Sequence, residues 1–354
     1  MTAISVPGAG VSCPAPTTDS ERVLLGHGSG GKLSAALLRD HILPCFTSAV
    51  LRELGDAAVV PAAGSELAVS TDAFVVNPLE FPGGDIGVLA VHGTINDLAM
   101  MGADPRYITV SFIIEEGLPL ATLDRIIASM ARSAERAGVA IVAGDTKVVE
   151  RGKADGVFVT TTGIGTFDGD FRASPTRARA GDVVLVSGPI GAHGMTIMSV
   201  REGLGFETEL MSDTAALHPL VRQLRRAVGD AIHVMRDPTR GGVASALNEI
   251  AAASSVGIEL EEEEIPVDPP VFAACEVLGL DPLYVANEGV FLAVVPEAVA
   301  EAALAGLRAH PLGARSCRIG RVTGANAGTV WIRTAIGGTR VVDMLPGDQL
   351  PRIC

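Results

Sequence analysis

The chain has 354 residues, of which 48% are hydrophobic and 19% charged, and its formal net charge is -14. This length and composition predict an ordinary globular interior and favour two domains. The negative charge excludes a general nucleic-acid or anionic-membrane surface, but it is compatible with a phosphorylated ligand, because metal ions can lie between carboxylates and phosphates.

The five cysteines are widely spaced and no C-x-x-C pair occurs. We therefore expect neither a disulfide framework nor a tetrathiolate zinc site, and a reducing cytoplasm fits best. Residues 1–20 lack a charged segment followed by an unbroken apolar one, so we interpret them as a flexible extension and not as a signal peptide. No apolar run reaches the roughly 18 residues that a membrane span needs.

Helices and strands alternate in the first half of the chain. Apolar residues at helical spacing within 120–137, such as Ile126 and Met130, predict the strongest helix. The remaining patterns predict helices at 33–41 and 86–101, and strands at 67–70, 107–114, 139–143 and 157–165. We place an N-terminal domain at 21–176.

A second unit begins after a boundary near 177–182. Its patterns predict strands at 183–187, 232–235, 258–261 and 290–295, and helices at 195–202, 218–227, 241–253 and 297–307. We place a C-terminal α/β domain at 177–345 and a mobile tail at 346–354, because Pro and Gly interrupt that last segment. The predicted class is α/β in the mixed α+β sense, with two lobes.

Five aspartates follow apolar strands or stand in turns next to glycine: Asp56, Asp72, Asp97, Asp145 and Asp237. Ligand sites in α/β sheets cluster beyond the carboxyl ends of strands. Carboxylates that converge there need cations, and oxygen-only ligands suit Mg²⁺ bound to a phosphorylated substrate. The alternative is that each aspartate is simply a turn or helix-capping residue.

Two glycine-rich segments are candidate phosphate sites. Gly26–Lys32 nearly matches the P-loop pattern but has Leu33 where the pattern needs Ser or Thr, so a Walker-type site is excluded. A loop whose backbone N–H groups cover phosphates remains open, as does a flexible linker. Gly241-Gly242 precedes a predicted helix and follows Arg240, which suits either an anion site or a tight turn.

Two further residues are candidates for chemistry. Glu288 stands before Gly289 at the start of a predicted strand, where it is either a general base or a solvated turn residue. Cys354 is the last residue, and a thiol at the tip of an extended arm is a poor packing residue but a good chemical handle. The histidines show no H-x-x-H or H-E-x-x-H spacing, so the sequence does not support a zinc hydrolase.

Taken together, these segments resemble the HypE family of hydrogenase maturation proteins, the carbamoyl dehydratases. That family lies within the ATP-binding superfamily of aminoimidazole ribonucleotide synthetase, selenophosphate synthetase and thiamine-monophosphate kinase. The Pro-Arg-Ile-Cys terminus separates HypE from its relatives. The matching segments are residues 28–32, 55–58, 70–72, 96–102, 143–147, 237–242, 287–289 and 351–354.

The resemblance implies a fold, a reaction and partners. It implies two α/β domains in a homodimer whose N-terminal sheets form a barrel across the two-fold axis. It implies ATP-dependent dehydration of a carbamoyl group on the C-terminal thiol to a thiocyanate, which supplies cyanide for [NiFe]-hydrogenase. The implied carbamoyl donor is HypF, and the implied cyanide acceptor is the HypC–HypD complex.

The resemblance also assigns roles to residues. Cys354 is the carrier, Glu288 the candidate base and Lys147 its charge partner. Asp56, Asp72, Asp97 and Asp145 are expected to hold Mg²⁺. The expected ATP-binding residues are Gly30, Gly31, Lys32, Asn96, Gly144, Asp237, Thr239, Arg240, Gly241 and Gly242.

Two alternatives remain open at this point. One is a related synthetase or small-molecule kinase in which the tail is incidental. The other is a non-catalytic, nucleotide-binding scaffold that presents Cys354 for docking. The terminal motif argues against the first, and the grouping of Lys147 and Glu288 with the aspartate motifs argues against the second.

Overall fold

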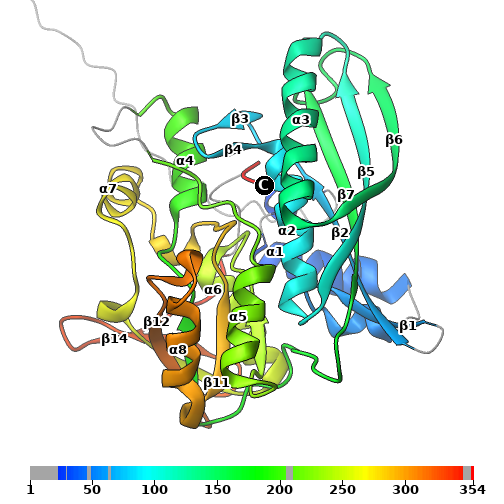
Figure 1. Ribbon diagram of the computed structural model, residues 1–354. Coiled ribbons are helices and arrows are strands. Elements are labelled where there is room, and N and C mark those ends of the chain that lie inside the picture. The colour runs from blue at the N-terminus through cyan, green and yellow to red at the C-terminus, as the bar shows by residue number, and fades with distance from the viewer. Residues whose placement is uncertain (1–22, 29, 46–48, 63–64, 205–209, 346–351) are drawn as a thin grey trace, which may run out of the picture.

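The computed structural model describes residues 23–28, 30–45, 49–62, 65–204, 210–345 and 352–354. The chain forms two lobes, each built on one large sheet, and the last residues lie between the lobes (Figure 1). The predicted mixed α+β class is confirmed. The predicted N-terminal extension, 1–20, lies outside the described residues.

The N-terminal lobe contains a five-stranded sheet in the order β1-β2-β7-β5-β6, in which only β5 and β6 are parallel. Helices α2 and α3 cover one face of this sheet, and β3 and β4 form a small hairpin (Figure 1). The elements are β1 (Ala58–Ala62), β2 (Ser65–Phe74), β3 (Glu80–Phe81), β4 (Gly84–Asp85), β5 (Asp104–Glu115), β6 (Ala140–Val149), β7 (Val157–Thr166), α1 (Lys32–Leu37), α2 (Ile86–Met100) and α3 (Leu120–Ala137).

Local chemistry sets the limits of these helices. The Asp85 carboxylate accepts hydrogen bonds from the backbone N–H groups of Gly87 and Val88, which caps α2. Helix α3 buries Ile126 and Met130 on its sheet-facing stripe and ends at Gly138, which has a left-handed φ of 69°. The predicted helix at 120–137 is therefore confirmed.

The C-terminal lobe contains a seven-stranded sheet in the order β14-β13-β10-β12-β8-β11-β9, in which only β10 and β13 are parallel. Its elements are β8 (Asp182–Val186), β9 (Val234–Arg236), β10 (Gly257–Glu261), β11 (Leu292–Pro296), β12 (Cys317–Thr323), β13 (Val330–Arg333), β14 (Thr339–Val341), α4 (Ala192–Arg201), α5 (His218–Val228), α6 (Gly242–Ser254), α7 (Pro269–Leu278) and α8 (Ala300–Arg308).

Helices pack on both faces of the C-terminal sheet. On β8, Val183 and Leu185 belong to the apolar cluster of α5 and α8, whereas Val184 and Val186 belong to the cluster of α6. A strand buried on both sides needs apolar residues at every position, which explains the unbroken run of Val and Leu.

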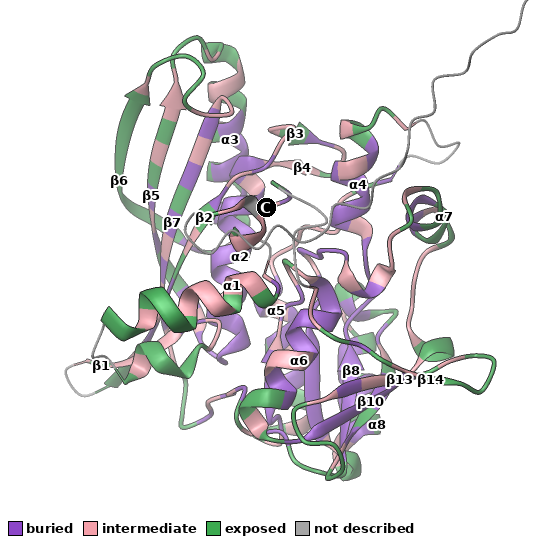
Figure 2. Ribbon diagram, turned by 180° about the vertical axis from the view of Figure 1, so that it is seen from behind, coloured by how far each residue is buried: buried purple, intermediate pink, exposed green. Residues whose placement is uncertain are grey.

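The N-terminal sheet is covered on one face. Buried and less buried residues alternate along β7, and nearly every residue of β6 is exposed (Figure 2). The strands at 67–70 and 139–143 were predicted too short, because β2 continues to Phe74 and β6 to Val149. Asp72 and Asp145 thus lie inside strands and not beyond their ends.

Candidate functional site

Four buried or part-buried carboxylates from different elements meet where the two lobes join. Asp56 precedes β1, Asp72 lies in β2, Asp97 lies in α2 and Asp237 follows β9. The Ser70 hydroxyl donates to Asp97 Oδ2 at 2.6 Å, and the Thr94 hydroxyl donates to Asp72 Oδ2 at 2.8 Å. These four were predicted to converge together with Asp145, and the fold brings the four close to one another.

Crowded carboxylates in a dry environment hold protons more tightly. Burial, reinforced by the neighbouring carboxylates, raises the pKa of Asp237 to about 8 and that of Asp97 well above its usual range. Burial also raises the pKa of Asp56 to about 6, although the adjacent Arg236 guanidinium, with Nε 3.2 Å from Oδ1, opposes this. Full ionisation of the cluster is therefore unfavourable unless a cation compensates the charge.

The oxygen donors of this cluster fit a magnesium ion. Among the residues that the structure describes, no three His, Cys, Asp or Glu side chains are arranged to hold a metal by themselves. Mg²⁺ usually keeps several waters and takes one or two carboxylates together with substrate phosphates. The crowded oxygens of Asp97 and Asp237, which release their protons more readily beside a cation, suit such a shared site.

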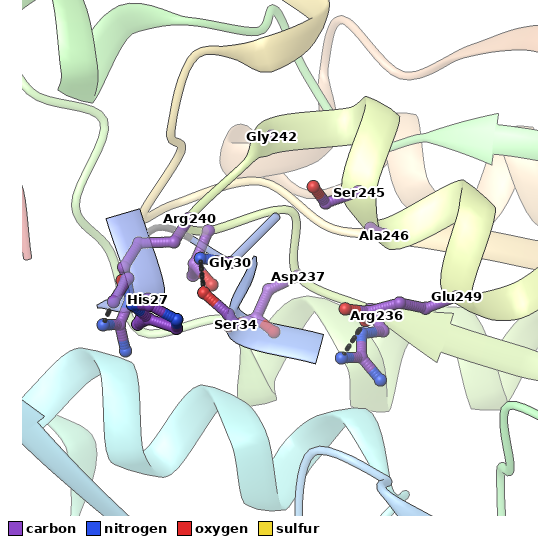
Figure 3. A pocket seen from close by; sticks show the side chains of 12 residues that line it. His27, Gly30, Ser34, Arg236, Asp237, Arg240, Gly242, Ser245, Ala246 and Glu249 are labelled. Atoms are coloured by element: carbon purple, nitrogen blue, oxygen red, sulfur yellow. Dashed lines mark hydrogen bonds and ion pairs between the residues drawn. The ribbon is translucent and has the colours of Figure 1, made fainter. Parts of the chain in front are cut away.

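A pocket of about 270 Å³ opens beside the carboxylates (Figure 3). One wall comes from the glycine-rich segment near α1, and the other from the loop after β9 and the first turns of α6. Its lining residues are His27, Gly28, Gly30, Ser34, Arg236, Asp237, Thr239, Arg240, Gly242, Ser245, Ala246 and Glu249. Arginines, main-chain N–H groups and a helix N-terminus form an environment that suits phosphate groups.

Two glycines allow these walls to approach each other. Gly30 has a φ of 73°, and a Cβ there would lie 2.8 Å from the carbonyl oxygen of Arg240. Gly241, with a φ of 78°, is the N-cap of α6, and a Cβ there would lie 2.1 Å from Ser245 Oγ. Both positions require glycine, which favours the loop interpretation of Gly26–Lys32 over a flexible linker.

Ser245 is a site residue that sequence analysis missed. Its side chain is buried, lines the pocket and has an Oγ without a hydrogen-bond partner among the described residues. A buried hydroxyl left without a partner is costly, so this one is suited to a bound ligand. Its spacing of four residues from Gly241, one helical turn, was the available sequence signal.

Glu288 lies next to the cluster and is 3% exposed. Burial, with the charge of Asp237 adding to it, raises the pKa of Glu288 well above its usual range, and its Oε1 lacks a hydrogen-bond partner in the described structure.

Asn96 donates to the Ala215 carbonyl at 2.9 Å and accepts from the Leu217 N–H at 2.8 Å. The Asn96 amide is thus committed to the main chain, and it does not line the pocket.

The last three residues are seated between the lobes. Ile353 is 2% exposed, and Cys354 packs against the apolar cluster that contains Phe74 and Ala286. The Val75 N–H donates to a terminal carboxylate oxygen of Cys354 at 3.0 Å. Sequence analysis expected a mobile arm, but its end is docked here, and residues 346–351 lie outside the described part.

The Cys354 docking site consists largely of main-chain contacts. The Asn77 N–H and the Arg201 guanidinium donate to the Arg352 carbonyl at 3.3 and 2.7 Å, and His193 Nε2 lies 2.9 Å from the Ile353 carbonyl. Arg352 also forms an ion pair with Asp155. No motif pointed to His193 or Arg201, because their contacts exist only after the lobes assemble.

Asp145 and Lys147 lie apart from the other candidates. They form an exposed ion pair with a 2.9 Å separation on β6. Three strand spacings, about 14 Å, separate β6 from Asp72 on β2. Within one chain, the fold therefore does not unite them with the carboxylate cluster, and the same holds for Gly144 on β6.

Lys32 also lies outside the pocket lining. Its ammonium group forms an exposed ion pair with Asp343, and its N–H donates to the Leu345 carbonyl at 2.9 Å. The neighbouring Gly31 is the N-cap of α1. These two residues connect the glycine-rich loop to the end of the C-terminal lobe.

Two family models match consecutive parts of the chain. Residues 54–167 match AIR synthase related protein, N-terminal domain, and residues 179–333 match AIR synthase related protein, C-terminal domain. Carbamoyl dehydratase HypE of Cupriavidus necator is 55% identical over 336 residues, 95% of each chain. The chain belongs to the HypE family. The family resemblance seen in the sequence is thereby confirmed.

Solved structures of HypE proteins share this fold. A crystal structure of a HypE–HypF complex aligns with a TM-score of 0.83 at 47% identity, covering 88% of this chain and all of that one. HypE in complex with ATP aligns with a TM-score of 0.79 at 50% identity, covering 94% of this chain and all of that one. No helix in the described residues is long and apolar enough to span a membrane.

Proposed function

We propose that this chain uses ATP to dehydrate a carbamoyl group carried on Cys354, which yields the cyanide ligand for [NiFe]-hydrogenase assembly. The observation that carries this proposal is the seating of Cys354 between the lobes, against the apolar cluster that contains Phe74 and Ala286, with the buried Glu288 two residues beyond Ala286. A carrier thiol and a base belonging to one region are what the reaction requires. Membership of the HypE family supports the same assignment.

The reaction balances without any oxidant. The γ-phosphoryl group of ATP moves to the amide oxygen of the thiocarboxamide. The amide nitrogen then gives up two protons while the C–O bond breaks and phosphate leaves, so that S–C(=O)–NH₂ becomes S–C≡N. ADP and phosphate are the other products.

The pocket residues are suited to hold the triphosphate. The main-chain N–H groups at the start of α6, the Arg240 guanidinium and the Ser245 hydroxyl provide donors for phosphate oxygens. Asp72, Asp97 and Asp237 are the residues we expect to hold Mg²⁺. When bound, that ion neutralises charge on the transferred phosphoryl group.

Glu288 is suited to remove protons from the nitrogen. Burial raises the pKa of its carboxylate, which makes the ionised group a stronger base than an exposed glutamate. Its Oε1 has no competing partner among the described residues. Hydrogen bonds to the surrounding loops hold the Glu288 backbone, and with it the carboxylate, in place.

We further propose a homodimer built on the open face of the N-terminal sheet. Tyr107 and Ile113 on β5 are exposed on the face away from α2 and α3, and a second copy of this sheet is a complementary occupant. Lys147 and Asp145 lie on the neighbouring strand β6, so we assign their part in the site to the assembled dimer. Replacing Ile113 with lysine should yield monomers in analytical ultracentrifugation, whereas an unchanged dimer would reject this face.

HypF is the proposed carbamoyl donor, in line with the HypE–HypF complex among the similar structures. The HypC–HypD complex is the proposed cyanide acceptor.

The test of the main proposal is mass spectrometry of the terminal peptide, residues 348–354, released by cleavage before Asp348. Incubation with ATP, carbamoyl phosphate and the carbamoyltransferase should add a carbamoyl group and then remove one water. The Cys354→Ala variant should show neither change. Transfer of phosphate to a small molecule with an unmodified tail would instead favour a kinase, and nucleotide binding without either reaction would favour a scaffold.

A further inference from the structure

One segment contacts the main chain of Glu288 and, through His193, is linked to the docked terminus. Residues 210–217 connect the region after α4 to α5 and run through the junction of the two lobes. The Ser212 N–H donates to the Pro82 carbonyl at 2.9 Å, so the segment is tied to the N-terminal lobe. The Ala215 N–H donates to the Glu288 carbonyl at 3.4 Å, which ties it to the C-terminal lobe.

His193 links this segment to the terminus. The Ile353 carbonyl can only accept, so the contact with His193 Nε2 requires the proton on Nε2. Nδ1 then accepts from the Ser212 hydroxyl at 2.8 Å, and the same hydroxyl oxygen accepts from the Thr214 N–H at 3.2 Å. Every donor in this series of hydrogen bonds has an acceptor. One arrangement of protons therefore satisfies Ser212, His193 and the tail together.

Asp213, the next residue, holds the Glu288 backbone. Its carboxylate accepts from the Glu288 N–H at 3.2 Å and from the Gly289 N–H at 3.1 Å. A Cβ at Gly289 would lie 1.7 Å from the Asp213 carbonyl oxygen, so the two segments are in direct contact. Asp213 therefore contacts the main chain of the residue proposed as the base, and its role is to position that residue.

We infer that residues 210–217 couple seating of the terminus to placement of Glu288, with His193, Ser212 and Asp213 as positioning residues. A seated tail fixes His193, His193 orients Ser212, and the adjoining Asp213 fixes the backbone that carries Glu288. The base is then ordered when the loaded thiol is present. This inference rests on the proposed function for its catalytic consequence but not for its structural one.

The structural consequence is measurable without turnover. In the full-length chain, we compare alkylation of Cys354, normalised to the exposed Cys45, with hydrogen exchange of the Glu288 and Gly289 amides. His193→Ala should raise both rates by about tenfold, because a buried hydrogen bond is lost at the tail and the change passes to amides that His193 does not touch. His193→Gln should restore much of the protection, because its amide can still donate to the Ile353 carbonyl.

Ser212→Ala provides a second variant if His193→Ala folds poorly, since Ser212 is only partly buried. Arg340→Ala is the matched control, because its partner is Asp281, far from this segment in the sequence. The control should leave both rates unchanged. If His193→Ala and Ser212→Ala free Cys354 but leave exchange at Glu288 and Gly289 unchanged, the coupling does not exist.

The catalytic consequence is measured on chains already carbamoylated at Cys354. Asp213→Ala should slow dehydration by about tenfold without altering ATP affinity or loading, because only the base is displaced. A wild-type dehydration rate in this variant would overturn the positioning role of Asp213. Absence of dehydration in the carbamoylated wild-type protein would reject the proposed function. The hydrogen-exchange and alkylation results would still decide the coupling.

Discussion

The two large sheets of this protein differ in how many of their faces are covered by helices. The C-terminal sheet has helices on both faces, and its central strand β8 is buried at every position. The N-terminal sheet has α2 and α3 on one face, and its edge strand β6 is exposed almost throughout (Figure 2). The C-terminal sheet is thus covered within one chain, whereas the N-terminal sheet has an open face that suits association.

The chemistry lies where these unlike lobes meet. Asp72 and Asp97 come from the N-terminal lobe, and Asp237 and Glu288 come from the C-terminal lobe. Neither sheet alone brings these carboxylates together. The contrast therefore predicts that substitutions at the junction affect turnover, those in the closed sheet affect stability, and those on the open face affect assembly.

The largest expected effect is at the junction. Glu288→Gln should retain the fold, ATP binding and carbamoyl loading, because the amide has nearly the same shape as the carboxylate. It should lower the dehydration rate by about 10²–10⁴-fold, the usual contribution of a general base. Single-turnover mass spectrometry of the terminal peptide measures this rate. Thiocyanate formation at the wild-type rate would assign the proton to another group.

The second prediction compares the two sheets directly. Leu292→Ala in β11 removes a fully buried side chain and should lower the free energy of unfolding by about 2–5 kcal/mol. Val148→Ala on β6 removes an exposed one and should change it by less than about 0.5 kcal/mol. Denaturant unfolding at low protein concentration tests both. A cost for Val148→Ala that appears only at high concentration would show that the edge strand β6 is buried by association.

The third prediction concerns pH. The pKa of Asp237 is raised to about 8, from an ordinary value of 3.8, so the folded state keeps a proton that the unfolded state releases between these values. The free energy of unfolding should therefore fall as the pH rises from about 4 to 8 when no metal is present. Asp237→Asn should flatten this dependence in melting curves recorded in a chelating buffer. A melting temperature that rises across this range in the unmodified protein would contradict it.

The sequence predicted what depends on local pattern. The helix at 120–137 follows from apolar spacing, and the strand at 183–187 follows from an unbroken apolar run. The strand ends were harder, because Asp72 and Asp145 continue strands in which backbone pairing outweighs the turn preference of aspartate. Of the residues that line the pocket, the aspartate and glycine motifs pointed to Gly30, Asp237, Thr239, Arg240 and Gly242.

Contacts made by assembly of the lobes could not be predicted in this way. Asp213 and His193 stand in no recognisable motif, and each acquires its partners only when residues 210–217 lie against Glu288 and the terminus. Tail docking was missed for the same reason. The spacing of Pro and Gly indicates the conformational freedom of an isolated segment. It does not predict the contacts that its last residues make with the rest of the protein.

The smallest expected effect lies at a contact between the lobes that is fully solvated. Lys32 and Asp343 form an exposed ion pair, and such pairs contribute about 0–1 kcal/mol to stability because water and salt screen them. Lys32→Ala should therefore hardly change the melting temperature. The Lys32 side chain is absent from the pocket lining among the described residues, so ATP affinity should also fall by no more than a few-fold. Isothermal calorimetry decides the point, with Asp343→Ala as the control that breaks the same pair from the other side. A large loss of affinity in Lys32→Ala alone would show that the lysine leaves Asp343 and turns toward the phosphates when nucleotide binds. The glycine-rich loop would then close over the ligand, and the open contact between the lobes would be part of the site.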